Sequence, residues 1–257
     1  MCEVMAQQTH VARVAERWGP FLDRYPSPAA LAAVDHAEVV REWSGLGYNR
    51  RALNLHRCAR AVVANHGGAL PADLAQLLAL PGVGPYTARA VLAFAFEHDH
   101  GIVDTNTARV LARWSGRALR AAEAQAAADA AVPAGRAWAW NQALLDLGAT
   151  VCRRRATACG ECPVQASCRW AAAGWPAPDP ADGSAGVPRP QSRFEGSDRQ
   201  GRGRLVEALR RGPVAIDEAA AVMAWPNDPS RAHRVAASLV ADGLVRADAT
   251  GAHYVLS

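Results

Sequence analysis

The sequence Leu80-Pro81-Gly82-Val83-Gly84-Pro85-Tyr86-Thr87-Ala88 lies between two amphipathic stretches, and Ile102-Val103-Asp104-Thr105-Asn106 follows the second of them. Glycine allows a positive φ at Gly82 and Gly84 and leaves the backbone N–H groups uncovered. Such N–H groups form an anion-binding nest at the start of the next helix, whose first turn accepts Pro85. The pattern predicts a helix-hairpin-helix in which Gly82, Val83 and Gly84 hold a nucleic-acid phosphate without reading base sequence. An ordinary glycine-capped turn is the alternative.

Composition limits what the chain can be. Its 257 residues are enough for one large core or for two to three modest domains, and 50% of them are hydrophobic, as in globular proteins. No apolar run is long enough to predict a membrane span, and residues 1–9 contain an early acid and no signal-peptide core, so we expect a cytoplasmic protein. The net charge of +4 supports a polyanionic partner only weakly.

The chain contains no lysine, so all 28 basic residues are arginine. A GC-rich genome produces this bias, which therefore says nothing about function by itself. It does exclude reaction mechanisms in which a lysine amine forms a Schiff base with a sugar aldehyde. The α-amine is the primary amine that the chain retains.

Apolar periodicity predicts that the first 170 residues are all helical, because no β alternation precedes residue 240. Helix start and stop signals, such as Ser27-Pro28 and Gly67-Gly68, punctuate the pattern. The expected helices cover residues 4–18, 28–33, 35–43, 48–66, 71–79, 86–97, 104–113, 121–131 and 138–150.

The last third of the chain has a different composition. Residues 173–198 are rich in Pro, Gly, Ala, Asp and Ser, which is typical of a linker. In residues 199–257 we expect a helix around Leu205 and Leu209, helices over 216–224 and 229–241, and a hairpin of 244–246 with 253–256. This order is typical of a winged-helix-like module, and such modules bind DNA as often as they contact protein. The preceding chain divides into residues 1–104 and 105–172.

Four cysteines form a C-x6-C-x2-C-x5-C pattern that comprises Cys152, Cys159, Cys162 and Cys168. In a cytoplasmic protein, close cysteines indicate metal binding rather than disulfides. Zinc sites usually contain two short clips, and this pattern has one, which favours a single 4Fe–4S cluster with zinc as the alternative. Arg153, Arg154 and Arg155 lie in the first loop, where they could contact DNA phosphates or form a solvated basic loop.

These motifs together resemble the helix-hairpin-helix superfamily of DNA glycosylases, which includes endonuclease III and the MutY-type adenine glycosylases. Residues 3–9 (EVMAQQT), 45–48 (GLGY), 54–56 (NLH) and 103–106 (VDTN) resemble the MutY branch. The resemblance extends from residue 2 to about residue 175, and residues 190–257 are similar to the C-terminal extension of actinobacterial members. It implies a six-helix barrel domain with the hairpin, followed by an Fe–S cluster domain and the winged-helix-like module.

The resemblance also implies roles for four residues. Tyr86 stands where bifunctional members have the lysine that attacks the sugar, which implies a monofunctional glycosylase that leaves an abasic site. Glu3 corresponds to the general acid that protonates adenine, and its apolar helix would desolvate the carboxyl group. Asp104 corresponds to the carboxylate that faces the sugar, although a plain helix N-cap is the alternative. Asn106 resembles the residue that positions the attacking water.

The implied partner is double-stranded DNA, whose adenine has to leave the stack before cleavage. Gln7 and Tyr48 resemble side chains that fill the gap and support the opposite base; a core aromatic is the alternative for Tyr48. We therefore expect a monomeric, nucleoid-associated repair enzyme that removes adenine opposite 8-oxoguanine or guanine. The β-domain that recognises 8-oxoguanine in longer relatives is absent, so the opposite-base preference is open.

Two other functions fit the same motifs. A mismatch thymine glycosylase, acting on T opposite G, shares a tyrosine at the position of Tyr86. A non-catalytic Fe–S DNA-binding protein is the second alternative, because the segment that precedes the Glu3 motif in the family is missing and the chain resembles an N-terminally truncated form. In addition, Cys2 replaces a small hydroxyl residue beside Glu3.

Overall fold

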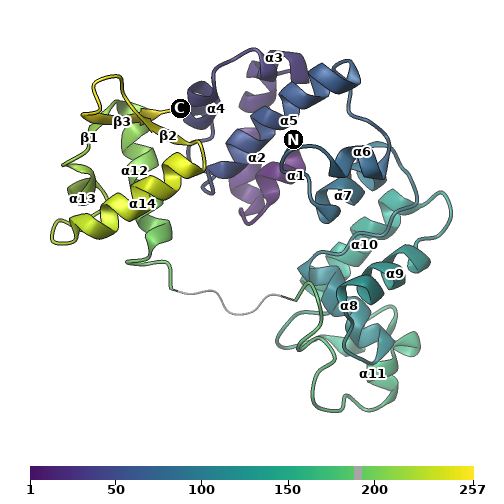
Figure 1. The fold of residues 1–257 in the computed structure, drawn as a ribbon. Helices are drawn as coiled ribbons and strands as arrows, with labels where there is room; N and C mark the ends of the chain where they lie inside the picture. The colour runs from purple at the N-terminus through teal and green to yellow at the C-terminus, as the bar shows by residue number, and fades with distance from the viewer. Residues whose placement is uncertain (188–192) are drawn as a thin grey trace. The chain divides into compact units, whose positions relative to one another are not determined.

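The computed structural model describes residues 1–187 and 193–257, which form two compact units (Figure 1). The first unit contains Met1–Pro71, Ala79–Gly82 and the described part of Gln191–Ser257. The second contains Ala72–Leu78 and the described part of Val83–Pro190. The predicted mainly helical class is confirmed, and none of the described helices is both long and apolar enough to cross a membrane.

The N-terminal part of the first unit is entirely helical. Ser27 caps its third helix by accepting the N–H of Ala30 at 3.1 Å, and Gly67 ends the fifth with a φ of +61°. Both residues act as the predicted start and stop signals. The helices are α1 (Cys2–Ala6), α2 (Val11–Arg24), α3 (Pro28–Ala32), α4 (His36–Glu42) and α5 (Arg50–His66).

The single helix predicted over residues 4–18 is wrong. The chain leaves the helix after Ala6, passes through Gln8 at a φ of +54°, and starts α2 at Val11. The carbonyl groups of Val4 and Met5 accept hydrogen bonds from the Arg51 guanidinium. A distant side chain thus satisfies helix-end carbonyls, which periodicity could not reveal.

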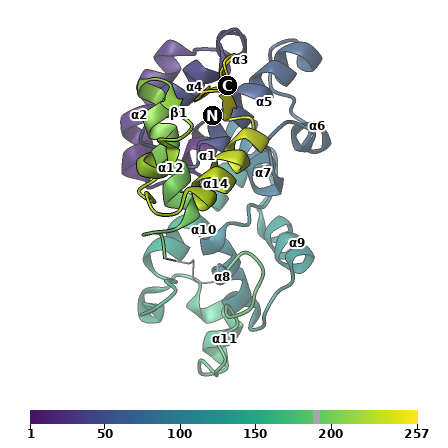
Figure 2. The same ribbon diagram turned by 60° about the vertical axis from the view of Figure 1, so that its left-hand side comes forward.

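The C-terminal part of the first unit contains more sheet than predicted. Val214–Ala215 forms strand β1 in addition to the predicted hairpin, and α13 (Ala219–Val222) is shorter than the predicted 216–224. A strand of 2 residues is too short to show alternation. The remaining elements are α12 (Asp198–Arg211), α14 (Pro229–Ala241), β2 (Val245–Ala247) and β3 (His253–Leu256). The sheet is antiparallel in the order β1-β3-β2, and α12 lies beside α14 in both views (Figures 1 and 2).

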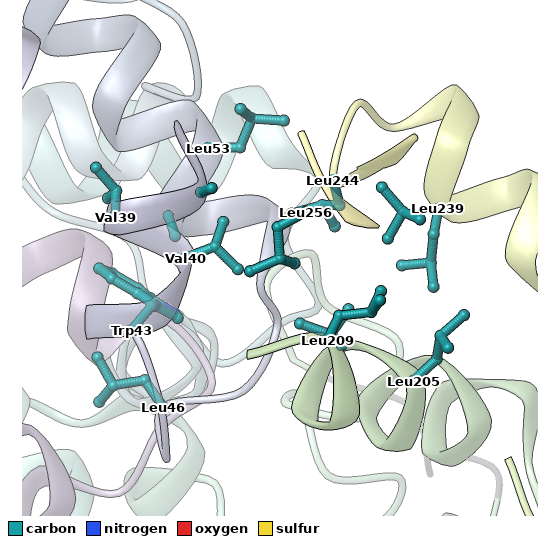
Figure 3. Packing of buried hydrophobic residues seen from close by; sticks show 14 of the residues in the cluster. Val39, Val40, Trp43, Leu46, Leu53, Leu205, Leu209, Leu239, Leu244 and Leu256 are labelled. Atoms are coloured by element: carbon teal, nitrogen blue, oxygen red, sulfur yellow. The ribbon is translucent and has the colours of Figure 1, made fainter. Parts of the chain in front are cut away.

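One continuous hydrophobic core joins the two parts of the first unit. Leu209 of α12 and Leu256 of β3 belong to the same buried cluster as Val40, Trp43 and Leu46 (Figure 3). All five side chains are at most 6% exposed. The C-terminal module therefore shares its core with the helices that precede the second unit in sequence.

The second unit packs helices around two smaller apolar clusters. Val110 and Leu111 pack with Leu144 in one cluster, and Ala90 packs with Ile102 in the other. The elements are α6 (Leu74–Leu78), α7 (Pro85–Ala95), α8 (Thr105–Ser115), α9 (Ala121–Ala131), α10 (Ala137–Thr150), the 3₁₀ turns η1 (Cys159–Glu161) and η2 (Gln165–Ser167), and α11 (Arg169–Ala172).

The segment predicted as a linker packs against the second unit in its first half. Ala185 donates its N–H to the Leu119 carbonyl at 2.9 Å, and Ser184 accepts the Leu119 N–H at 3.0 Å. Ala181 and Ser184 are 3% and 5% exposed. This part of 173–198 therefore belongs to a folded unit, and residues 188–192 of the predicted linker lie outside the described residues.

A pair of histidines, the partly buried His36 and the buried His56, connects α4 and α5. His56 is 1% exposed, and its Nε2 lies 3.0 Å from the Val34 carbonyl oxygen, while no partner of Nδ1 is found among the described residues. The His36 ring lies edge-on, with centroids 4.3 Å apart. Burial is the main cause that lowers the pKa of both rings, helped by Arg57 and Arg60 at His36 and by His36 at His56. The fold therefore favours neutral rings.

Acidification should destabilise the fold through this pair. Because the pKa values in the folded protein lie below the ordinary histidine value of 6.5, the unfolded chain binds more protons as the pH falls from 6.5 towards the folded values. We expect the melting temperature to fall from pH 7.5 to pH 5.5 (roughly one unit either side of the reference pKa), and to fall less in His56→Gln. The exposed His233→Gln serves as the control and should keep the wild-type dependence; equal slopes in all three proteins would contradict the assignment.

Candidate functional site

The loop between α6 and α7 has the predicted hairpin geometry at one of its two glycines. Gly82 has a φ of +76°, and a Cβ added there would lie 2.6 Å from the Cβ of Asn54, so only glycine fits. Gly84 instead has an extended backbone with a φ of −91°, which corrects the expectation of a positive φ there. It is the N-cap of α7, and Pro85 occupies the first turn as predicted. Val83 between the glycines is partly buried.

Asp104 is held by its own backbone at the start of α8. Its Oδ1 accepts the N–H groups of Asn106 at 2.9 Å and Thr107 at 2.7 Å, and Thr107 Oγ1 accepts the Asp104 N–H at 2.8 Å. Both carboxylate bonds end on Oδ1, which leaves Oδ2 outside the cap. A negative charge at this position interacts favourably with the N–H groups of the helix N-terminus. Asp104 is therefore both an N-cap and a fixed, partly buried carboxylate.

Asn106 is oriented by an arginine that sequence reasoning missed. Arg109 Nη2 donates to Asn106 Oδ1 at 3.0 Å and to the Gly148 carbonyl at 2.6 Å, while its Nε donates to the Cys152 carbonyl at 2.7 Å. Arg109 is 6% exposed, and burial lowers its pKa. Gly148 allows this close packing, because an added Cβ would lie 2.7 Å from the Asn106 Cβ. One side chain thus connects Asn106 with the first cysteine of the cluster motif.

Tyr86 lies in the same unit as Asp104. Its partly buried ring packs against the cluster that contains Ile102, two residues before Asp104. The backbone segment that precedes Asp104 is held by Asn141, a residue that is 1% exposed. Asn141 Oδ1 accepts the Ile102 N–H at 3.0 Å. Nothing in the sequence distinguished this asparagine, because its partners lie elsewhere in the chain. Tyr86, Asp104 and Asn106 therefore all belong to the second unit.

The four cysteines line one pocket together with Arg113 and Trp170. Arg113 Nη1 lies 3.3 Å from Cys152 Sγ and donates to the Arg153 carbonyl at 2.8 Å. Burial raises the pKa of the Cys152 thiol, and the hydrogen bond and charge of Arg113 oppose that rise. Among the described residues, no three His, Cys, Asp or Glu side chains are arranged to hold a single metal ion. The remaining pocket cysteines are Cys159, Cys162 and Cys168.

Arg113 is held by the segment that follows the cysteines. Its guanidinium bonds both carboxylate oxygens of Asp179, with Nε 3.0 Å from Oδ1, and stacks over the Trp170 ring at 5.0 Å. Burial alone would lower the pKa of Arg113, but the bonds to Asp179 and Cys152 outweigh it and raise that pKa. Arg113 also lowers the pKa of Asp179 against the effect of burial. The pair is therefore charged.

Arg153, Arg154 and Arg155 project from the loop after the first cysteine, and all three are exposed. Within the described residues, none of them forms an ion pair closer than 4.0 Å. Exposed guanidinium groups without carboxylate neighbours can contact phosphate at little desolvation cost.

Glu3, Gln7 and Tyr48 lie in the first unit. Glu3 and Gln7 are partly buried, in α1 and directly after it. Tyr48 is 42% exposed and has a φ of +45°, which is rare for a residue with a bulky side chain. A strained and exposed aromatic residue is typical of a functional position rather than of a core, so the alternative of a core aromatic for Tyr48 is wrong.

Arg51 ties these segments together. Its Nη1 donates to the carbonyls at the end of α1, including Met5 at 2.8 Å, and its Nη2 donates to Leu46 at 2.8 Å and Gly47 at 3.1 Å. The guanidinium also stacks over the Tyr48 ring at 5.6 Å. Arg51 is 8% exposed, and burial lowers its pKa to about 10. The sequence indicated only a basic helix start here, although Arg51 positions the segments that carry all three residues.

The fold and these sites define a helix-hairpin-helix protein with a cysteine-lined pocket and a capped carboxylate. The chain belongs to the HhH-GPD superfamily of base excision DNA repair proteins, whose family model matches residues 1–134. This confirms the predicted family and the predicted helix-hairpin-helix glycosylase fold.

Relatives cover most of the chain. The adenine DNA glycosylase of Mycolicibacterium smegmatis is 40% identical over 253 residues, which are 97% of this chain and 84% of the relative. The adenine DNA glycosylase of Mycobacterium tuberculosis is 42% identical over 249 residues, 95% of this chain and 80% of the relative.

Solved structures share the fold over about two thirds of the chain. A thermostable thymine-DNA glycosylase is 27% identical with a TM-score of 0.62, covering 67% of this chain and 82% of its own. A trapped endonuclease III–DNA covalent intermediate is 24% identical with a TM-score of 0.61, covering 68% of this chain and 84% of its own, and it supports the fold alone.

Replacing Arg51 by lysine should destabilise the first unit. An ammonium group cannot reach both the α1 carbonyls and the Leu46–Gly47 carbonyls, so buried acceptors lose their donors at a cost of about 2–4 kcal/mol. Arg50→Lys is the matched control, because Arg50 is 65% exposed and makes one ion pair, at 3.3 Å from Asp242. Denaturant unfolding should show a change within about 0.5 kcal/mol for that control. Equal losses in the two variants would refute the role of Arg51.

Proposed function

We propose that the chain is a monofunctional DNA glycosylase that hydrolyses the N-glycosidic bond of adenine mispaired with 8-oxoguanine or guanine. The observation that carries the proposal is Asp104, a carboxylate fixed by two backbone N–H groups, in one unit with Tyr86 and in a chain without lysine. An anion beside the sugar stabilises an oxocarbenium ion, and the absence of a lysine amine disfavours Schiff-base cleavage of the strand. The adenine DNA glycosylases that cover most of the chain favour adenine as the base.

The proposed reaction begins when Glu3 donates a proton to adenine, which makes the base a better leaving group. The C1′–N9 bond then breaks, and its electron pair leaves with the base. Asp104 stabilises the positive charge that develops on the sugar. Water adds to C1′ and loses a proton, which gives free adenine and an abasic site.

Asn106 is proposed to orient that water. An arginine can only donate hydrogen bonds, so the contact from Arg109 fixes Oδ1 as the acceptor of the Asn106 amide. The Nδ2 group therefore points away from Arg109 as a donor. The Tyr86 hydroxyl is proposed to form a hydrogen bond near the carboxylates of Glu3 and Asp104.

Duplex binding is proposed to use several weak contacts. The N–H groups of Gly82, Val83 and Gly84 would hold one phosphate, and the exposed Arg153–Arg155 would hold others. Tyr48 and Gln7 would occupy the space of the extruded adenine and support the opposite base. The protein would act as a monomer in the cytoplasm, bound to DNA of the nucleoid.

The cysteine pocket fits one 4Fe–4S cluster, with Cys152, Cys159, Cys162 and Cys168 as its ligands. Four thiols line a common pocket, and their spacing contains one short C-x2-C clip where zinc sites usually contain two, which favours a polynuclear group over zinc. Bound there, the cluster would supply iron ions that cross-link the four cysteine thiolates and so order the loop of Arg153–Arg155, and it would take no part in hydrolysis. Arg113 would donate to the Cys152 thiolate.

The reaction is tested by single-turnover assays on duplexes with A opposite 8-oxoguanine, A opposite guanine, and T opposite guanine. We expect release of adenine and no strand cleavage until the abasic site is treated with alkali. Asp104→Asn should lower the rate by at least about 10³-fold, because it removes the anion, while duplex affinity stays within a few-fold.

Other outcomes identify the rival functions. The likeness to a thymine-DNA glycosylase makes thymine the second candidate base, and release of thymine alone would overturn the proposal. Mismatch binding without any release, unchanged by Glu3→Gln, would identify a non-catalytic DNA-binding protein. Asp23→Asn is a control for loss of a carboxylate outside the site and should keep the wild-type rate.

The cluster is tested separately from the activity. Anaerobically purified protein should contain about four iron and four sulfide ions per chain and show a broad absorbance band near roughly 410 nm. Cys159→Ser should lower the iron content, whereas Cys58→Ser should not, because Cys58 is buried in α5 away from the pocket motif. Stoichiometric zinc in place of iron would contradict the assignment.

A further inference from the structure

Arg210 of α12 is hydrogen-bonded to the residue that follows Tyr48. Its Nη2 donates to Asn49 Oδ1 at 2.8 Å, and its Nε donates to the Val40 carbonyl at 3.1 Å. The Arg210 side chain is 10% exposed and is also paired with Glu207 on its own helix. The C-terminal module therefore reaches the loop that carries Tyr48 through a buried, charged donor.

Arg50, the residue after Asn49, forms an ion pair with the C-terminal module. Asp242, which follows α14, lies 3.3 Å from Arg50 and also binds Arg202 of α12. The apolar core continues beneath these contacts, where Leu209 and Leu256 face the helix of Val40 (Figure 3). The two residues after Tyr48 are thus both held by the C-terminal module.

The charges of the module favour contacts within the protein, such as those to Asn49 and Arg50, over a role as a second DNA-binding surface. Three arginines of the module are at most 28% exposed and are paired with carboxylates: Arg202 with Asp242, Arg210 with Glu207, and Arg231 with Asp198. A guanidinium group that is already paired and partly buried has to give up that pair before it can contact a phosphate.

The backbone of Tyr48 needs support from both sides. A positive φ at a bulky residue costs free energy and persists only where the surroundings hold it. Arg51 supplies one side, through the Gly47 carbonyl and the ring of Tyr48. Asn49 lies on the other side, where Ala52 donates to its carbonyl at 3.0 Å and Arg210 anchors its side chain.

We propose that the C-terminal module positions Tyr48, with Arg210 as the positioning residue, and so sets how well the protein distinguishes a mispair from a paired duplex. The inference rests on the proposed function, in which the Tyr48 side chain enters the DNA duplex beside the extruded adenine. The part of the substrate that this positioning affects is the base opposite adenine, which Tyr48 would support. No contact between the module and DNA is required.

The test measures dissociation constants for two duplexes that cannot be cleaved, both with a 2′-fluoro sugar at adenine. One has adenine opposite 8-oxoguanine, and the other has adenine opposite thymine. We expect Tyr48→Ala and Arg210→Ala each to lower the affinity ratio of mispaired to paired duplex by about tenfold. Tyr48→Ala removes the aromatic ring that would support the opposite base, and Arg210→Ala removes one charged hydrogen bond. Arg210→Lys should recover part of the ratio, since its ammonium group can still reach one acceptor.

Two controls separate positioning from general destabilisation. Arg211→Ala removes a neighbouring charge on α12 that is 80% exposed, and should leave the ratio within about twofold. Leu239→Ala removes a core side chain of the module that is 1% exposed, and should lower the melting temperature but keep the ratio where the protein is folded.

The outcomes also separate the inference from the proposed function. An unchanged ratio in Arg210→Ala, together with a lowered ratio in Tyr48→Ala, would overturn the inference and leave the glycosylase assignment intact. A wild-type protein without preference for the mispair and without adenine release would overturn the proposed function, and the inference with it.

Discussion

The burial of the Arg51 guanidinium is the constraint on which the first unit depends. No carboxylate pairs with it among the described residues, so backbone carbonyls have to satisfy a cation that is 8% exposed. These carbonyls belong to two segments, the end of α1 and the loop before α5. One guanidinium can bond to both segments because its N–H donors point in several directions. Glu3, Gln7 and Tyr48 lie in those two segments. Their arrangement therefore follows from one buried cation.

Local signals in the sequence were sufficient wherever one residue and its near neighbours set the geometry. Asp104 caps α8 through bonds to residues two and three positions away, and Ser27 caps α3 in the same manner. The end of α1 could not be predicted, because its carbonyls bond to Arg51, which lies 46 residues beyond Met5. The apolar spacing in residues 4–18 is compatible with one continuous helix. The helix ends at Ala6 where Arg51, a residue distant in sequence, bonds to its last carbonyls.

The same limit explains what the sequence did not reveal in the second unit. Arg109 and Arg113 were indistinguishable from surface arginines, yet each is at most 6% exposed and bonds to the backbone near Cys152. Asp179 lies in a segment whose composition is typical of linkers, and its ion pair with Arg113 fixes that segment to the cysteine pocket. Composition describes the average preference of a segment, whereas one buried charge pair decides its place.

The C-terminal module shows a case in which the sequence contained a usable signal. Helix α4 buries Ala37, Val39 and Val40, and adjacent residues of a helix point in different directions. A helix of 7 residues that is buried on more than one side needs two partners. One partner is α5, and the other is the C-terminal module, whose Leu209 and Leu256 belong to the same core. Segments at the two ends of the chain thus fold as one unit, although the second unit lies between them in the sequence.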